Sequence, residues 1–186
     1  GFECVDKLSI PEENTEFSGD ILPSDGAEVY LRTDLALAPI RAYIWKNIEG
    51  AKENEFGKVI IAREFASGKE MTVSPGETLV VDFGQNCAGV PSFVFKAAEG
   101  TVLTCLPAEL LNDGNGAKIR GMDGPEGSCH RENLRIPHTG IRLDYTFAAG
   151  DNYVTYYPHC TFFGYRYVST VSYTHLRAHE TGRNLV

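Results

Sequence analysis

The stretch VVDFGQNCAGV, from Val80 to Val90, decides how this sequence of 186 residues is interpreted. It contains Asp82-Phe83-Gly84, the three residues that hold magnesium in a protein kinase. A kinase carries its His-Arg-Asp loop before that motif, whereas His130-Arg131 comes after it and is followed by Glu132. Glycine-rich and Val-Ala-Ile-Lys segments are also missing from the residues before it. The kinase interpretation is therefore rejected.

The same stretch has a simpler structural interpretation. β-Branched residues lead into Asp82, and Gly84 tolerates backbone angles that other residues avoid. The side-chain amides of Gln85 and Asn86 can bond to nearby backbone groups in a turn. We therefore predict a strand that ends at Asp82-Phe83 and a turn after Gly84.

Similar runs of β-branched and aromatic residues occur at short intervals on both sides of this stretch, and Gly and Pro separate them. The predicted strands are 58–64, 71–74, 78–83, 91–96, 101–106, 142–147, 153–157 and 161–169. A long helical pattern is absent, which argues against a parallel α/β sheet. The pattern predicts an all-β protein, either an antiparallel β-sandwich or a barrel.

Composition narrows the class of partner. The net charge of −8 argues against nucleic acid and against an anionic membrane surface. No apolar run reaches the ~18 residues of a membrane span. The chain has five cysteines without a Cys-x-x-Cys pair, which favours free thiols and a cytoplasmic location over a disulfide framework.

The longest irregular segment runs from Asn112 to Ile136. Its Asp113-Gly114-Asn115-Gly116 resembles the start of a calcium loop, but Gly124 stands where such a loop carries its last glutamate. We therefore interpret the segment as turns. The pair His159-Cys160 lies in a run of strands, between 153–157 and 161–169, and is expected to be extended, so that the two neighbouring side chains point to opposite faces and chelate poorly. No metal site and no cofactor are expected.

Four ordered motifs carry a resemblance to a known family. These are Val80–Val90, Ala98-Glu99-Gly100-Thr101-Val102-Leu103, Pro107-Ala108-Glu109-Leu110-Leu111-Asn112-Asp113-Gly114 and Phe162-Phe163-Gly164-Tyr165-Arg166-Tyr167-Val168. Together they resemble the concanavalin-like β-sandwich module of bacterial α-L-rhamnosidases, over about Leu79 to Ser169. The resemblance implies a concanavalin-like or jelly-roll sandwich, with a lead-in from a preceding β domain.

The resemblance also implies a function. The parent protein would be an inverting glycoside hydrolase that removes terminal L-rhamnose, using a general acid and a general base on an (α/α) barrel. That barrel is expected as a partner in the same polypeptide and is missing from this chain. No catalytic residue is therefore assigned, and the fragment is expected to be inactive. Asp82, Glu109 and Glu132 are interpreted as scaffold residues.

The last residues suggest a different origin from the rest. Val171 to Thr181 match, in order, the translation of a transposon sequencing adapter, and Asn184-Leu185-Val186 match its constant continuation. We therefore expect 1–35 to end a preceding domain or linker, 36–170 to form the sandwich, and 171–186 to be non-native residues of a metagenomic fragment. His175 and His179, spaced as on one face of a helix, are accordingly not read as a zinc site.

Sugar binding is the open alternative. Candidate ligand-binding residues are Trp45, Asp82, Gln85 and Asn86, because aromatic rings stack on sugars while amides and carboxylates bond to their hydroxyls. A stand-alone carbohydrate-binding module for rhamnose-containing glycans therefore remains beside the accessory-module hypothesis. A β-sandwich interaction domain of unrelated function is the third alternative.

Overall fold

The computed structural model describes residues 30–65, 69–134, 141–148, 152–172, 176–179 and 184–185. In chain order its elements are the 3-10 helix η1 (Thr33–Leu35), β1 (Arg41–Glu49), β2 (Lys58–Phe65), β3 (Glu70–Val73), β4 (Thr78–Pro91), β5 (Phe93–Ala97), β6 (Val102–Ala108), β7 (Leu110–Leu111), β8 (Cys129–His130), β9 (Leu143–Thr146), β10 (Val154–Tyr156), β11 (Phe163–Ser172), β12 (Leu176–His179) and β13 (Asn184–Leu185). In the described residues, no helix is long and apolar enough to cross a membrane.

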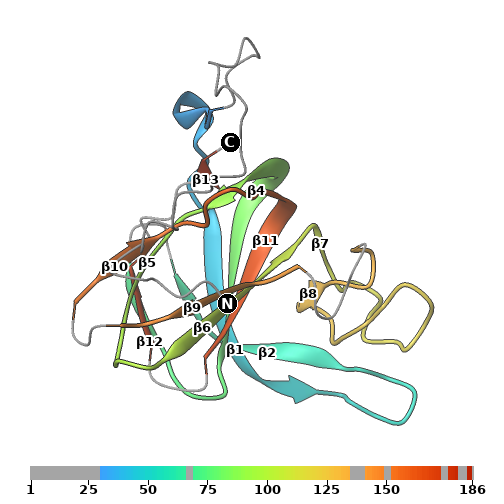
Figure 1. The fold of residues 1–186 in the computed structure, drawn as a ribbon. Coiled ribbons are helices and arrows are strands. Elements are labelled where there is room, and N and C mark those ends of the chain that lie inside the picture. The colour runs from blue at the N-terminus through green and yellow to red at the C-terminus, as the bar shows by residue number, and fades with distance from the viewer. Residues whose placement is uncertain are drawn as a thin grey trace, which may run out of the picture. The chain divides into compact units, whose positions relative to one another are not determined.

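Two large antiparallel sheets and a small ribbon make up the described fold (Figure 1). The larger sheet has the strand order β2-β1-β4-β11-β6-β9, and β13 also pairs with β4. The smaller sheet has the order β10-β5-β12-β3, while β7 and β8 form a separate two-stranded ribbon. The prediction of an all-β antiparallel fold is confirmed.

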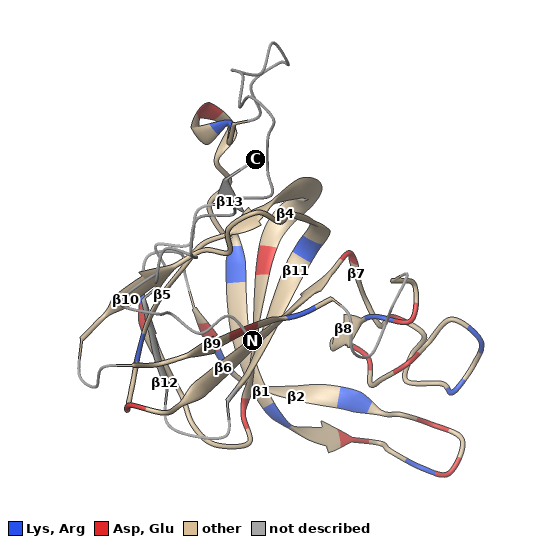
Figure 2. Ribbon diagram, viewed as in Figure 1, with Lys and Arg blue, Asp and Glu red and all other residues tan. Residues whose placement is uncertain are grey.

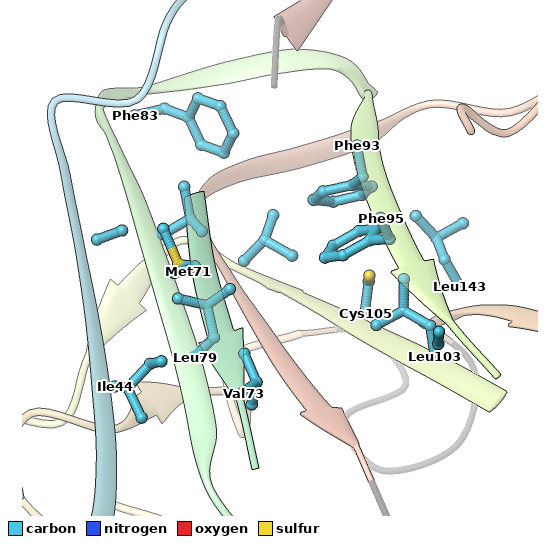
Figure 3. Packing of buried hydrophobic residues seen from close by; sticks show 14 of the residues in the cluster. Ile44, Met71, Val73, Leu79, Phe83, Phe93, Phe95, Leu103, Cys105 and Leu143 are labelled. Carbon is cyan, nitrogen blue, oxygen red and sulfur yellow. The ribbon is translucent and has the colours of Figure 1, made fainter. Parts of the chain in front are cut away.

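The main core lies between the two sheets (Figure 3). Alternation along β4 explains which side chains enter it, because neighbouring residues of a strand point to opposite faces. Leu79, Val81 and Phe83 belong to the main core, where Phe83 meets Tyr165 edge-on with ring centroids 5.7 Å apart. The smaller sheet contributes apolar side chains to the same cluster, namely Met71, Val73, Phe93, Phe95 and Ala97.

A second, smaller cluster lies on the other face of the larger sheet. We call it the outer cluster; its buried members are Tyr43, Val80, Ala108 and Tyr167. Leu111 and Cys129, from β7 and β8, pack against it. The Tyr43 hydroxyl donates a hydrogen bond to the Gly127 carbonyl at 2.7 Å, so the long segment after β7 is attached to this face.

The structure corrects the prediction that the strand ends at Asp82-Phe83. β4 continues through Gly84 to Pro91, and the extra residues form a bulge against β11. Tyr167 is in register with Asp82, while Tyr165 is in register with Cys87. One residue of β11 therefore faces four residues of β4, and the positive φ of Gly84, 85°, accommodates the change of direction.

Two further differences concern segments outside that stretch. Strand β1 was not predicted, although it pairs with both β2 and β4 in the larger sheet. The prediction of an extended backbone through His159-Cys160 was wrong: both residues lie in a bend, where Cys160 has a φ of 58°. The rings of His159 and Tyr157 lie 4.7 Å apart instead.

The chain divides into two compact units, Gly1–Tyr30 and Leu31–Val186. The assignment of 1–35 to a preceding domain or linker stays a prediction, because residues 1–29 lie outside the described part. The origin of 171–186 likewise stays a prediction. Within that segment His179 belongs to strand β12, while His175 lies outside the described residues.

Candidate functional site

The charged side chains of the larger sheet form a row across its outer face. We call Glu64, Arg41, Asp82 and Arg166, on β2, β1, β4 and β11, the charged row. Arg41 is in register with Asp82, and Arg166 lies opposite the bulge of β4. Figure 2 shows basic, acidic and basic positions side by side on β1, β4 and β11. Strand pairing thus brings together residues that are far apart in the sequence.

Asp82 is the centre of this row. Its carboxylate accepts hydrogen bonds from Arg166 Nε at 2.8 Å and from Arg166 Nη2 at 3.0 Å. The Gly84 N–H donates to the same carboxylate at 2.7 Å. Only 7% of Asp82 is exposed. The hydrogen bond to Asp82 raises the pKa of the Arg166 guanidinium. Asp82 therefore joins the bulge to β11.

The two arginines of the row lie over tyrosines of the outer cluster. The Arg41 guanidinium carbon is 4.8 Å from the centre of the Tyr43 ring, and that of Arg166 is 4.9 Å from the Tyr167 ring. Arg41 Nε also donates to Glu64 at 2.6 Å. Cation–π contacts of this kind stabilise partly exposed arginines by about 0.5–1 kcal/mol each. The row is a paired surface whose groups neutralise one another.

Of the other candidate ligand-binding residues, Trp45 lies apart from Asp82, while Gln85 and Asn86 lie on the bulge that follows it. Trp45 is half-buried against the outer cluster, in register with Thr78 at the start of β4. Its indole Nε1 is buried without a hydrogen-bond partner in the described part of the chain. Gln85 and Asn86 are exposed on the bulge. Trp45 thus shares the outer face with Asp82 but lies at the other end of the β1–β4 pairing, and its assignment to sugar binding stays a prediction.

The remaining carboxylates considered from the sequence are Glu109 and Glu132. Glu109 follows β6 and accepts a hydrogen bond from the Asn133 amide at 2.9 Å. A Cβ placed on Gly164, next to the start of β11, would lie 3.5 Å from the Glu109 carboxylate. Glu132 is exposed, and its backbone N–H donates to Asp123. Structural contacts are therefore present at both positions.

Sequence reasoning missed a buried polar cluster in the long segment after β7. Asp123 accepts hydrogen bonds from the backbone N–H of Arg131 at 2.7 Å and of Glu132 at 2.8 Å. His130 Nδ1 lies 3.0 Å from the same carboxylate, and 5% of His130 is exposed. Burial opposes the charge on Asp123, but these bonds outweigh it and lower its pKa.

Asn112 completes this cluster, which we call the loop clamp. Its amide Nδ2 donates to Ser128 Oγ at 3.0 Å, and its Oδ1 accepts the Asp123 N–H at 3.2 Å. The Ser128 hydroxyl donates to the Pro125 carbonyl at 2.7 Å. Asn112 was read as a turn residue, and the Gly-rich composition of the segment carries no signal that these polar groups meet. Among the described residues no group of three or more His, Cys, Asp or Glu side chains could hold a metal ion.

The cysteines of the described part are free. Burial raises the pKa of the Cys105 and Cys129 thiols to about 12, so neither is a thiolate at neutral pH. The prediction of free thiols is thus confirmed for Cys87, Cys105, Cys129 and Cys160.

Comparison with known proteins identifies the family of this chain. Residues 72–183 match the model of the bacterial alpha-L-rhamnosidase concanavalin-like domain. The chain is 30% identical over 102 residues to an alpha-L-rhamnosidase of Alteromonas sp. (strain LOR), covering 55% of this chain and 9% of the relative. It is 31% identical over 117 residues to an alpha-L-rhamnosidase of Streptomyces avermitilis, covering 63% and 10%.

A solved structure shares the fold. The rhamnosidase from Klebsiella oxytoca with rhamnose bound superposes with a TM-score of 0.50 at 15% identity, covering 81% of this chain and 28% of that chain. The chain thus spans about a tenth of the curated relatives that it matches. The ordered motifs, the antiparallel sheets and the family match agree: this chain belongs to the bacterial alpha-L-rhamnosidase concanavalin-like domain family.

Proposed function

We propose that this chain is a non-catalytic accessory module of an α-L-rhamnosidase, which supports a catalytic (α/α) barrel in the same polypeptide. The family match supports its place in a rhamnosidase. The pKa shifts of the carboxyl groups support the proposal that the module is not catalytic. An inverting glycosidase needs a carboxylic acid with a raised pKa, held apart from a second carboxylate that activates water.

Three carboxyl groups of this chain have the opposite character. In the described part of the chain, each carboxyl group with a displaced pKa has a lowered one: Asp34, Glu77 and Asp123. Burial alone would raise the pKa of Glu77, but the Ser74 N–H and Arg63 outweigh it. Carboxylates held ionised by such donors stabilise structure and are poor proton donors at neutral pH.

Exposed apolar side chains support contact with another part of the polypeptide. Phe162 is 72% exposed and directly precedes the residue paired with Gly89 of β4. Ile40 is 65% exposed and lies against Gly84, since a Cβ on that glycine would be 3.1 Å from the isoleucine Cδ1. Both therefore flank the second half of β4. We call them the apolar pair and propose that the barrel covers them.

The test uses the full-length parent rhamnosidase with Phe162→Ser and Ile40→Ser. We expect kcat/KM on an aryl α-L-rhamnoside to fall several-fold and the thermal unfolding of barrel and module to separate into two transitions. Ile119→Ser is the matched control, because Ile119 is 58% exposed but lies in the long segment after β7.

Two outcomes would contradict the proposal. One is an apolar-pair variant that behaves like the Ile119→Ser control. The other is rhamnoside hydrolysis by the 186-residue chain alone. Calorimetric binding of L-rhamnose by the isolated chain, with the barrel interface unaffected, would instead favour the stand-alone carbohydrate-binding module.

A further inference from the structure

One strand holds the smaller sheet together. β12 pairs with β3 through Leu176↔Val73 to His179↔Glu70, and with β5 through Leu176↔Ala97 to His179↔Val94. Among the described strands β3 has no other partner in this sheet, so without β12 the order β10-β5-β12-β3 separates into β10-β5 and a lone β3. Figure 1 shows β12 in the layer of β5 and β10.

The neighbours of β12 define what the space between β3 and β5 can hold. We call this space the strand slot. Residue 176 is in register with Val73 and Ala97, which are buried in the main core. Residue 178 is in register with Met71 and Phe95, also in the main core. Positions 177 and 179 are in register with residues outside that cluster, such as Thr72 and Glu70.

The slot therefore makes two demands on its occupant. The occupant must offer backbone N–H and C=O groups on both edges, because β3 and β5 each leave a ladder to be completed. It must also fit apolar neighbours at alternate positions, since side chains of a strand alternate between faces. Neither demand specifies a particular sequence at positions 177 and 179.

We propose that the strand slot is a strand-binding site for the segment that follows β11, recognised by backbone pairing and by two alternate apolar positions. Such a site accepts a different sequence with the same alternation, and it accepts the segment as a separate peptide once the attached strand is displaced. The proposal does not depend on the proposed function. It gives the residues after β11 a role in completing the module, whatever their origin.

Engineered disulfides in the full chain test whether β12 separates β3 from β5. Thr72 and residue 177 are paired neighbours, so Thr72→Cys with Arg177→Cys should form a disulfide under mild oxidation. Thr72→Cys with Lys96→Cys is the control. Those positions lie on either side of β12, about 10 Å apart, beyond the reach of a disulfide. Peptide mapping of the reverse pattern would overturn the proposal.

Exchange tests the binding itself. Arg177→Pro in the full chain removes a backbone donor and disfavours β12 in a central position. A labelled peptide of residues 171–186 should bind this variant at least tenfold more tightly than it binds the unmodified chain. A peptide with Val-Thr-Val-Thr at 176–179 should bind similarly, and one with Leu176→Asp and Ala178→Asp should not.

Several results would overturn strand exchange. One is that neither apolar peptide binds the folded Arg177→Pro variant. Another is that the aspartate peptide binds this variant as tightly as the apolar peptides do. If the variant does not fold alone, refolding with the 171–186 peptide should restore its strand signal in circular dichroism. Absence of recovery would also count against the proposal.

Discussion

At the scale of single residues, Asp82 shows that the Asp-Phe-Gly sequence has a different role here from its role in a kinase. In a kinase the Asp-Phe-Gly carboxylate holds a metal ion, whereas here it accepts two hydrogen bonds from Arg166 and one from the Gly84 N–H. Because Asp82 is buried and Arg166 is partly exposed, we expect the pair to stabilise the fold more than a surface ion pair does.

Asp82→Asn should lower the free energy of unfolding by about 1–2 kcal/mol, because it removes the charge that Arg166 pairs with. Urea unfolding followed by circular dichroism measures the change. The matched control is Asp34→Asn, which breaks an exposed pair with Arg32 and should change stability little. Equal effects at the two positions would show that the buried pair has no special role.

Asp123 gives a prediction in pH. Its pKa is lowered in the folded chain, so its contribution to stability is complete above the unfolded value of about 3.9 and is lost as pH falls through the folded value. Asp123→Asn should therefore cost about 2 kcal/mol at pH 7, and the difference from the unmodified chain should shrink below about pH 4. A pH-independent difference in urea unfolding would contradict this account.

At the scale of elements, the bulge of β4 is the feature that sets the site. Gly84 has a positive φ, and Ile40 leaves little room beside it. Gly84→Ala should destabilise the chain by about 1–2 kcal/mol through backbone strain and crowding. Gly100→Ala is the control, because Gly100 also has a positive φ, of 77°, but nothing within 4 Å of a new Cβ.

The comparison separates the two causes. Thermal unfolding should show a larger loss of stability for Gly84→Ala than for Gly100→Ala, and the difference should come from the contact with Ile40. Adding Ile40→Ala should remove most of this difference. An excess that survives Ile40→Ala would show that crowding by this side chain is not the cause.

Local pattern predicted most strands because β-branched runs and Gly or Pro turns are local signals. Strand β4 is longer than predicted because its pairing with β11 continues beyond Gly84. The loop clamp was not predictable, since Asn112, Asp123 and His130 meet only after the segment folds onto the outer cluster. The charged row was not predicted for the same reason, because its members come from four strands and meet only through strand register.

At the scale of the whole molecule, the fluorescence of the only tryptophan, Trp45, provides a test for sugar binding. Trp45 is half-buried against the outer cluster, and packing there is the role that the structure describes. Titration of the chain with L-rhamnose should leave the Trp45 emission unchanged under the accessory-module proposal. A saturable shift that is absent in Trp45→Phe would instead make this residue a sugar platform.

The proposals together make the module depend on the chain that follows it. The strand slot needs a segment after β11, and the apolar pair needs a covering surface. The segment 171–186 is predicted to be non-native, and we therefore expect the native gene to encode a different occupant for the slot. That occupant should carry apolar residues at two alternate positions within the first residues after Thr170.

The most direct measurement is the sequence of the native gene past the codon for Thr170. We expect an open frame that encodes a strand with alternating apolar residues and then a helical domain with paired carboxylates. A stop codon soon after Thr170 would contradict it, since the module would then have no barrel of its own polypeptide to support.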